Sequence, residues 1–421
     1  MTRTKTLSYI VTILIISAAI FSYVFFDSNF LIRKWSIPLS SPGFLDTRLI
    51  GVAAESYAQG YDPLLKNPSN TILANEQQLN YPRIWHLLFL TGMDQSHTNL
   101  VGSIIVISFF VGLGLFWFAH EFDDLTYILL TIGVLSSAVM LGIERANIEL
   151  LLFLIITSAL IVNYSSSIKA LFIILFASVL KMYPIFGIFY LLKENKNKFW
   201  KLFFLGLGVF ILYLLITFSD SIKVYETTPK LAGSSFGMNV WWMGLRNNRF
   251  FNIQAIDEIV VLLKAISFIM VILVSAAALF FSLKSGSGNR FNNGKYLDSF
   301  RIGAGIYIGC FIVITNSDHR LLFLILTIPQ IASWLRNSEG TLSRIPLLTL
   351  SAMLFSLWST FIMRFLGRNP TFILEEFSNW IVLAGLLYMF FASSPDWFSN
   401  YVRRPLSRIK SFNIQAIPTD E

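Results

Sequence analysis

A small set of ionisable residues has the types and positions needed for group-transfer chemistry. Asp46 comes shortly after the first long apolar segment, inside the stretch Gly43–Pro63. A carboxylate just outside a bilayer is suited to act as a general base on a hydroxyl group. A simpler interpretation is that Asp46 only caps a short helix predicted over residues 47–58, with Gly60 following as its stop. The sequence leaves both interpretations open.

Four basic residues lie near the outer ends of predicted membrane segments: Arg145, Lys181, His319 and Arg320. Cations of this kind can hold a phosphate group, and arginine offers it a bidentate fork. Each residue also has a structural interpretation, as an interface anchor, a snorkelling side chain or part of a capped turn. Glu144 or Glu149 would then simply pair with Arg145.

The elements that must position these residues are membrane segments. Of the 421 residues, 55% are hydrophobic and only 13% are charged, whereas soluble domains carry about 25% charge. This composition excludes a soluble enzyme, a disordered chain and a nucleic-acid-binding domain. The net charge of +8 is typical of cytoplasmic anchoring, and the single cysteine, Cys310, excludes an intrachain disulfide.

The apolar pattern predicts about twelve crossings of a membrane. The apolar run after Met1–Lys5 is too long for a signal peptide and ends in Tyr23–Phe26, which is too bulky for a cleavage site, so we expect a retained first span. The predicted spans are 7–26, 99–119, 125–142, 148–163, 168–180, 183–192, 202–218, 259–283, 302–315, 321–334, 346–366 and 375–393.

The distribution of lysine and arginine predicts that both termini are cytoplasmic. With this orientation the inner segments carry roughly twice the density of basic residues found in the outer ones. We expect one membrane domain, 1–393, with two large extracytoplasmic loops, 27–98 and 219–258, followed by a basic cytoplasmic tail, 394–421. The long outer loops predict a site on the extracytoplasmic face.

The sequence gives no support to ATP-driven transport or zinc chemistry. It contains no P-loop, no H-E-x-x-H motif and no cysteine pair. The acidic cluster of Glu121, Asp123 and Asp124 is best interpreted as a solvated inner turn.

The motifs, taken in order, resemble glycosyltransferase family 87, whose members are C-type membrane enzymes that use polyprenyl-phosphate sugars. The resemblance rests on Asp46 through Pro63, Tyr81-Pro82-Arg83, Glu144-Arg145-Ala146-Asn147, Lys181-Met182-Tyr183-Pro184 and Asp318-His319-Arg320 through Pro329. The likeness is spread over residues 40–335. Arg83 replaces the second proline of one family motif, and Glu144-Arg145 replaces a Gly-Gln pair.

This resemblance implies an all-α C-type glycosyltransferase bundle with surface helices in the first outer loop. The implied donor is a polyprenyl-phosphate sugar, with mannose expected by family analogy, and the implied acceptor is an extracytoplasmic glycan or glycolipid. Asp46 would be the catalytic base of an inverting transfer, and Lys181, Arg145, His319 and Arg320 would bind the donor phosphate. Asn147, Tyr81, Tyr183 and Arg48 are the expected substrate contacts. No metal or other cofactor is required, because protein cations can neutralise the phosphate.

Two other classes stay open. An envelope polysaccharide polymerase or ligase also has about twelve spans, but its large outer loop usually lies late in the chain. A transporter or flippase for lipid-linked sugars would place ionisable residues inside several spans, and only Lys264 and Arg364 lie within the predicted ones. All three classes predict a multi-pass protein of the plasma membrane, with lipids and no nucleic acid as partners.

Overall fold

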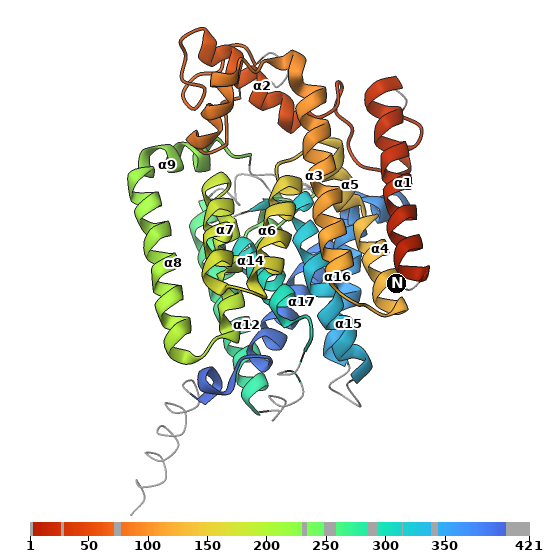
Figure 1. Ribbon diagram of the computed structural model, residues 1–421, viewed down its shortest axis with the longest axis vertical. Helices are drawn as coiled ribbons and strands as arrows, with labels where there is room; N and C mark the ends of the chain where they lie inside the picture. The colour runs from red at the N-terminus through yellow and green to blue at the C-terminus, as the bar shows by residue number, and fades with distance from the viewer. Residues whose placement is uncertain are drawn as a thin grey trace, which may run out of the picture.

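The computed structural model describes residues 3–26, 29–70, 77–229, 234–247, 258–284, 291, 294–313, 315–337 and 344–400. The predicted cytoplasmic tail lies outside the described residues from residue 401 onward. Labels follow Figure 1, with η for 3-10 helices. The first half of the chain forms α1 (Arg3–Phe26), η1 (Ile32–Trp35), α2 (Leu45–Ala58), η2 (Arg83–Thr91), η3 (Gln95–His97), α3 (Thr98–Ala119), α4 (Asp124–Val134), α5 (Ser137–Glu144), α6 (Glu149–Asn163), α7 (Ser167–Leu180) and η4 (Tyr183–Lys193). The second half forms α8 (Lys196–Ile216), α9 (Phe218–Thr227), β1 (Ser235–Phe236), α10 (Val240–Asn247), α12 (Val260–Lys284), α14 (Leu297–Val313), β2 (Asn316–Ser317), η5 (Asp318–Thr327), α15 (Ile328–Asn337), α16 (Arg344–Leu366) and α17 (Arg368–Ala392).

The described part of the chain is a helical membrane bundle. Six segments are long and apolar enough to cross a bilayer: Lys5–Phe26, Gln95–Ala119, Lys196–Ile216, Val260–Lys284, Arg344–Leu366 and Arg368–Ala392. A seventh is added if α4 and α5, which bend by 49° at their junction, count as one span. Helices α8 and α12 keep less than a quarter of their apolar windows buried, as expected for lipid-facing helices.

The number of twelve crossings stays a prediction. The segment predicted at 125–142 is the bent pair α4 and α5, and those at 148–163 and 168–180 are the short helices α6 and α7. The segment at 183–192 is the 3-10 helix η4, which begins at Tyr183 and has Pro184 as its second residue, at the predicted break. The segment at 321–334 is divided between η5 and α15.

Short polar residues fix where several helices begin. The Asp123 carboxylate accepts from the backbone N–H of Thr126 at 2.9 Å and caps α4, as its place in a polar turn predicts. Asn195 caps α8 in the same way, with its side chain accepting from Lys198 N–H at 3.0 Å. These caps keep the connections short, so that α7, η4 and α8 pack as consecutive neighbours.

The centre of the bundle is η5. Its residues 321–326 are all at most 1% exposed, and it packs against α5, α6, α14 and α16. A segment that is apolar all round requires such a fully enclosed position. The polar start of η5, at residues 318–320, therefore enters the bundle from one end only.

Parts of the two loops predicted to be extracytoplasmic close that end of the bundle (Figure 1). Helix α2 lies across it with η2 and η3 against it. A short antiparallel bridge between β1 and β2 pairs Ser235 with Ser317 and Phe236 with Asn316. Since Ser317 directly precedes η5, this bridge ties the second outer loop to the start of the central segment.

Candidate functional site

The site lies beneath α2, where the first outer loop meets the turn between α5 and α6. Three hydrogen bonds hold the two segments together. The N–H groups of Phe44 and Asp46 donate to the carbonyls of Glu144 and Arg145 at 3.0 and 3.1 Å, and Thr47 Oγ1 donates to the Ala146 carbonyl at 2.9 Å. Because the backbone is held at both residues 44 and 46, the Asp46 side chain is directed onto this turn.

Asp46 is not the cap of α2, as the simpler interpretation of the sequence proposed. The helix begins at Leu45, and its capping position is Phe44, which has a left-handed backbone with φ 61°. The Asp46 carboxylate instead accepts two hydrogen bonds from Arg145, at 2.7 and 3.0 Å, and a third from Asn147 Nδ2. Gly60, with φ +88°, lies just after the end of the helix, as predicted.

The charge state of Asp46 follows from these contacts. Burial by itself raises the pKa of this carboxyl, but the charge and hydrogen bonds of Arg145, together with His319 and Asn147, outweigh burial and leave the pKa lowered. Asp46 is therefore ionised at neutral pH.

A second carboxylate, Glu149, lies at the start of α6 and is fully buried. Its Oε1 atom accepts from Lys181 Nζ at 2.7 Å and from Arg320 Nε at 3.0 Å, and lies 3.4 Å from His319 Nε2. Its other oxygen, Oε2, has no hydrogen-bond partner among the described residues. One carboxylate thus holds three basic side chains that come from α7 and η5.

His319 and Asn147 connect the two carboxylates. Asn147 Nδ2 donates to Asp46 and lies 3.2 Å from His319 Nε2. The same histidine nitrogen faces Glu149, so it accepts from Asn147 when unprotonated and donates to Glu149 when protonated. We call this set the paired network; it consists of Asp46, Arg145, Asn147, Glu149, Lys181, His319 and Arg320.

Two tyrosines form aromatic walls against the cations. Lys181 Nζ lies 5.2 Å from the ring centre of Tyr81, and Arg320 Cζ lies 4.9 Å from that of Tyr183. Both distances are within cation–π range. The first outer loop is held in this position by Trp85, whose indole N–H donates to the Leu180 carbonyl at 3.1 Å.

The structure thus brings together eight of the nine predicted site residues. Arg48 is the exception. It is two positions after Asp46 on α2, and residues with that spacing do not face each other. Its side chain lines a separate cavity of about 480 Å³ with Asn29, Arg33 and Asn99.

We did not predict from the sequence that Glu149 is a central residue of the site. We considered it only as a partner for Arg145, whereas it is the hub for Lys181, Arg320 and His319. The signal that could have found it is an acidic residue at the very start of an apolar helix, where a charge is costly unless cations meet it.

Polar residues elsewhere in the first outer loop serve structural roles. Asp62 forms the predicted turn, with its Oδ1 accepting from Leu64 N–H at 3.1 Å. Arg83, which departs from the family motif, binds Asp62 at 2.9 Å and Asp220 of α9 at 2.7 Å. It therefore links the two outer loops at the surface.

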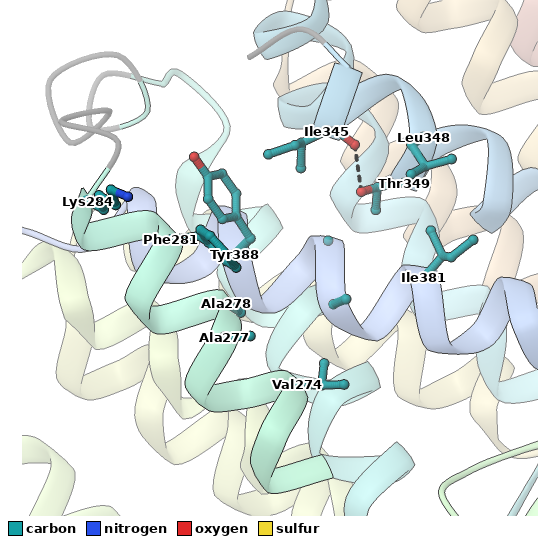
Figure 2. A pocket seen from close by; sticks show the side chains of 12 residues that line it. Val274, Ala277, Ala278, Phe281, Lys284, Ile345, Leu348, Thr349, Ile381 and Tyr388 are labelled. Carbon is teal, nitrogen blue, oxygen red and sulfur yellow. Dashed lines mark hydrogen bonds between the residues drawn. The ribbon is translucent and has the colours of Figure 1, made fainter. Parts of the chain in front are cut away.

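A large cavity of about 790 Å³ lies apart from this chemistry (Figure 2). It is a groove between α12, α16 and α17, lined mostly by aliphatic and small side chains such as Val274, Ala278 and Ile381. Lys284 is the one charged residue in its lining, and none of its lining residues belongs to the paired network. Its lining is mostly apolar, in contrast to the charged side chains of the paired network.

Comparisons of this chain with protein-family models, with curated proteins and with solved structures find no match.

Proposed function

We propose that this chain is a membrane glycosyltransferase that moves a sugar, with mannose as the expected one, from a polyprenyl-phosphate donor to an extracytoplasmic glycan or glycolipid. One observation carries the proposal. Asp46, Arg145, Lys181 and the pair His319–Arg320 come from four distant parts of the chain and meet in one buried cluster. A carboxylate base beside several cations is the combination that phosphate departure with base-assisted attack requires.

In the proposed reaction, the acceptor hydroxyl oxygen attacks the anomeric carbon of the donor. A carbon–oxygen bond forms to the acceptor while the bond from the anomeric carbon to the phosphate oxygen breaks, with inversion. The hydroxyl proton passes to Asp46, and the lipid phosphate leaves with the bonding electron pair. Arg145, Lys181 and Arg320 stabilise the anion that departs.

The pairing of Asp46 suggests an order of binding. An aspartate whose pKa is lowered by Arg145 is a poor base, since an efficient base has a pKa close to the working pH. A donor phosphate would compete for the Arg145 guanidinium and so release the carboxylate. Asp46 would then gain basicity only after the donor is bound, so donor binding would come before activation of the acceptor hydroxyl.

The basic side chains around Glu149 also favour binding of the donor phosphate in the paired network. Two basic side chains, Lys181 and Arg320, share its Oε1 atom with His319 nearby. One carboxylate neutralises only one of these charges. The remaining positive charge is available to a phosphate.

A transporter or flippase for lipid-linked sugars is the second candidate, and one observation favours it. Helices α4 and α5 are bent by 49° at their junction, and Lys181 lies where α7 gives way to η4. Interrupted helices beside a polar site are typical of transporters. A polymerase or ligase would share the proposed chemistry and differ in its acceptor.

The test is sugar transfer from synthetic polyprenyl-phosphate-mannose in proteoliposomes. We expect the wild type to transfer the sugar and Asp46→Asn to lose activity by about 10²–10⁴-fold, the range for a general base. Asp62→Asn is the matched control, because Asp62 lies in the same loop outside the paired network. It should retain transfer.

Equal activity in the wild type and Asp46→Asn would support the glycosyltransferase proposal but show that Asp46 is not the general base. If mannose and other polyprenyl-phosphate sugars give no transfer, while the labelled lipid crosses the bilayer, the transporter replaces the enzyme.

A further inference from the structure

A basic surface lies at the predicted outer end of α1 and α16, apart from the paired network. Two adjoining cavities, of about 510 and 480 Å³, share Asn29 and Arg33 in their linings. The first cavity adds Lys34 and Arg364, and the second adds Arg48. We call Arg33, Lys34, Arg48 and Arg364 with these two cavities the basic trough.

The charges of the basic trough are not compensated. No acidic residue lines either cavity. Within the described part of the chain, none of the four basic side chains forms an ion pair, in contrast to Arg145, Lys181 and Arg320. Glu144 lies behind the wall, where Tyr23 O–H and Ser40 N–H donate to its Oε1. The trough therefore presents a positive face that an anion can occupy without displacing a carboxylate.

Two polar atoms in the walls also lack partners. Asn29 Oδ1 and Arg48 Nε are shielded from solvent and form no hydrogen bond with the described residues. Buried polar atoms of this kind are normally satisfied, so each is a position where a ligand or a water is expected. The Arg48 Nε–H is a donor that suits an anionic oxygen.

The segment that carries Arg33 and Lys34 is held firmly. Ile32 is fully buried, and the Trp35 indole donates to the Leu135 carbonyl at 2.6 Å. Ser36 then turns the chain with φ 58°, and its N–H closes the short helix on the Arg33 carbonyl at 3.1 Å. Ile32 and Trp35, the first and last residues of η1, anchor the segment. Because the backbone of Arg33 and Lys34 is already ordered, their binding to an anion carries only a small entropic cost.

Exposed aromatic side chains indicate that the trough lies at the level of lipid headgroups. Phe26 and Phe30 near the end of α1 and Phe365 at the end of α16 are about 70% exposed. Aromatic residues beside lysine and arginine are typical of a membrane–water interface. The Lys34 ammonium lies 4.6 Å from the ring centre of Phe30, so the charged and apolar parts form one surface.

We propose that the basic trough binds the phosphate of an anionic lipid headgroup in the extracytoplasmic leaflet. The lipid chains would lie along the exposed aromatic ends of α1 and α16, while the phosphate contacts Arg33, Lys34, Arg48 and Arg364. The proposal depends on the membrane orientation of the chain and not on glycosyl transfer.

The experiment measures lipid retention by the full chain, by native mass spectrometry after purification from nanodiscs that contain phosphatidylglycerol and phosphatidylcholine. We expect the wild type to retain phosphatidylglycerol selectively. Arg33→Gln/Lys34→Gln should weaken that retention by on the order of tenfold, because each basic residue near a membrane surface adds measurably to anionic lipid binding. Lys66→Gln/Lys223→Gln is the matched control, since it removes two other outer charges, and it should retain the lipid as the wild type does.

A second variant guards against misfolding of the double variant, and a soluble competitor distinguishes a lipid from a free phosphate. Arg364→Gln, at the exposed end of α16, should give a smaller loss in the same direction even if the double variant folds poorly. Glycerol phosphate tests whether the site binds a soluble phosphate. The lipid proposal is wrong if glycerol phosphate stabilises the wild type but not the double variant while lipid retention is unselective. Equal retention by the wild type, Arg364→Gln and a folded double variant also overturns it.

Discussion

Asp318 and His319 are consecutive residues of η5, but their side chains enter two different clusters. His319 joins the paired network, where Asp46 and Glu149 each meet cations. Asp318 instead interacts with Glu375 and Glu376 of α17, and we call these three residues the carboxyl cluster. Both clusters are buried, since Asp318 is 1% exposed and Glu149 is 0% exposed.

The two clusters reduce the free-energy cost of burying carboxyl groups in different ways. In the paired network the charges are kept and each carboxylate is matched by a cation. In the carboxyl cluster no cation is among the polar partners that the structure describes: Ser359 Oγ donates to Glu375 at 2.6 Å, and the carboxyl groups of Asp318 and Glu375 share a hydrogen bond. Three buried carboxylates without a cation would be far more costly than three carboxylic acids. The comparison indicates that only one side of η5 is built to work with charge.

The largest expected effect is that of Glu149→Gln. This change removes the carboxylate that holds Lys181 and Arg320 and leaves two buried cations without their partner. We expect a loss of about 3–5 kcal/mol in the free energy of unfolding. Denaturant or thermal unfolding in detergent micelles measures it.

The control for this prediction is the double variant Glu149→Gln/Lys181→Gln. Removing one of the unpartnered cations should recover part of the lost stability, so the double variant should lose less than the two single variants together. Strict additivity would mean that Glu149 and Lys181 do not interact, against their 2.7 Å contact.

The second effect concerns Asp46 and pH. Because the pKa of the Asp46 carboxyl is lowered in the folded chain, its pairing with Arg145 stabilises the fold above the unfolded pKa of about 3.9. That contribution is lost as the pH falls through the folded value. We expect Asp46→Asn to be less stable than the wild type by about 1.5–3 kcal/mol at pH 7, the range for hydrogen bonds to a charged group.

Unfolding curves at a series of pH values measure this difference between wild type and Asp46→Asn. The difference should shrink only below about pH 4. A difference that shrinks between pH 5 and 7 would contradict the lowered pKa and would indicate that Arg145 does not control this carboxyl.

How far the sequence predicts this arrangement depends on the kind of interaction. The chain order of the motifs predicted that Asp46, Arg145, Lys181 and His319 share one face, because each lies near an outer end of an apolar segment. Local chemistry also predicted the stop at Gly60 and the turn at Asp62. These signals need only spacing and neighbouring residue types.

Long-range pairing escaped the same reasoning. Phe44 occupies the capping position of α2 because backbone hydrogen bonds hold residues 44 and 46 against the turn that contains Glu144 and Arg145. The same hydrogen bonds place the Asp46 side chain beside Arg145 and not at the cap. The carboxyl cluster was missed entirely, since Glu375 and Glu376 meet Asp318 only when α17 packs beside α14 and η5 is placed between α5 and α16. Sequence periodicity does not specify which helices become neighbours.

The smallest expected effect, and the one that tests the comparison most directly, is that of Glu375→Gln. It is the same chemical change as Glu149→Gln, made at another buried position, which is 7% exposed, on the other side of η5. Glutamine keeps an acceptor oxygen for Ser359 and removes no charge that a cation needs. We expect a change of less than about 1 kcal/mol in the free energy of unfolding, of either sign, because replacing a neutral buried group by one of the same shape is nearly neutral.

Measured under the same conditions, the two glutamine variants should differ by several-fold in their effect on stability. A loss as large as that of Glu149→Gln would mean that Glu375 is charged and held by a cation. Such a cation would have to come from outside the described residues of this cluster, in which Glu375 interacts with the Ser359 hydroxyl and with the carboxyl group of Asp318. The two sides of η5 would then differ only in which cation meets the carboxylates.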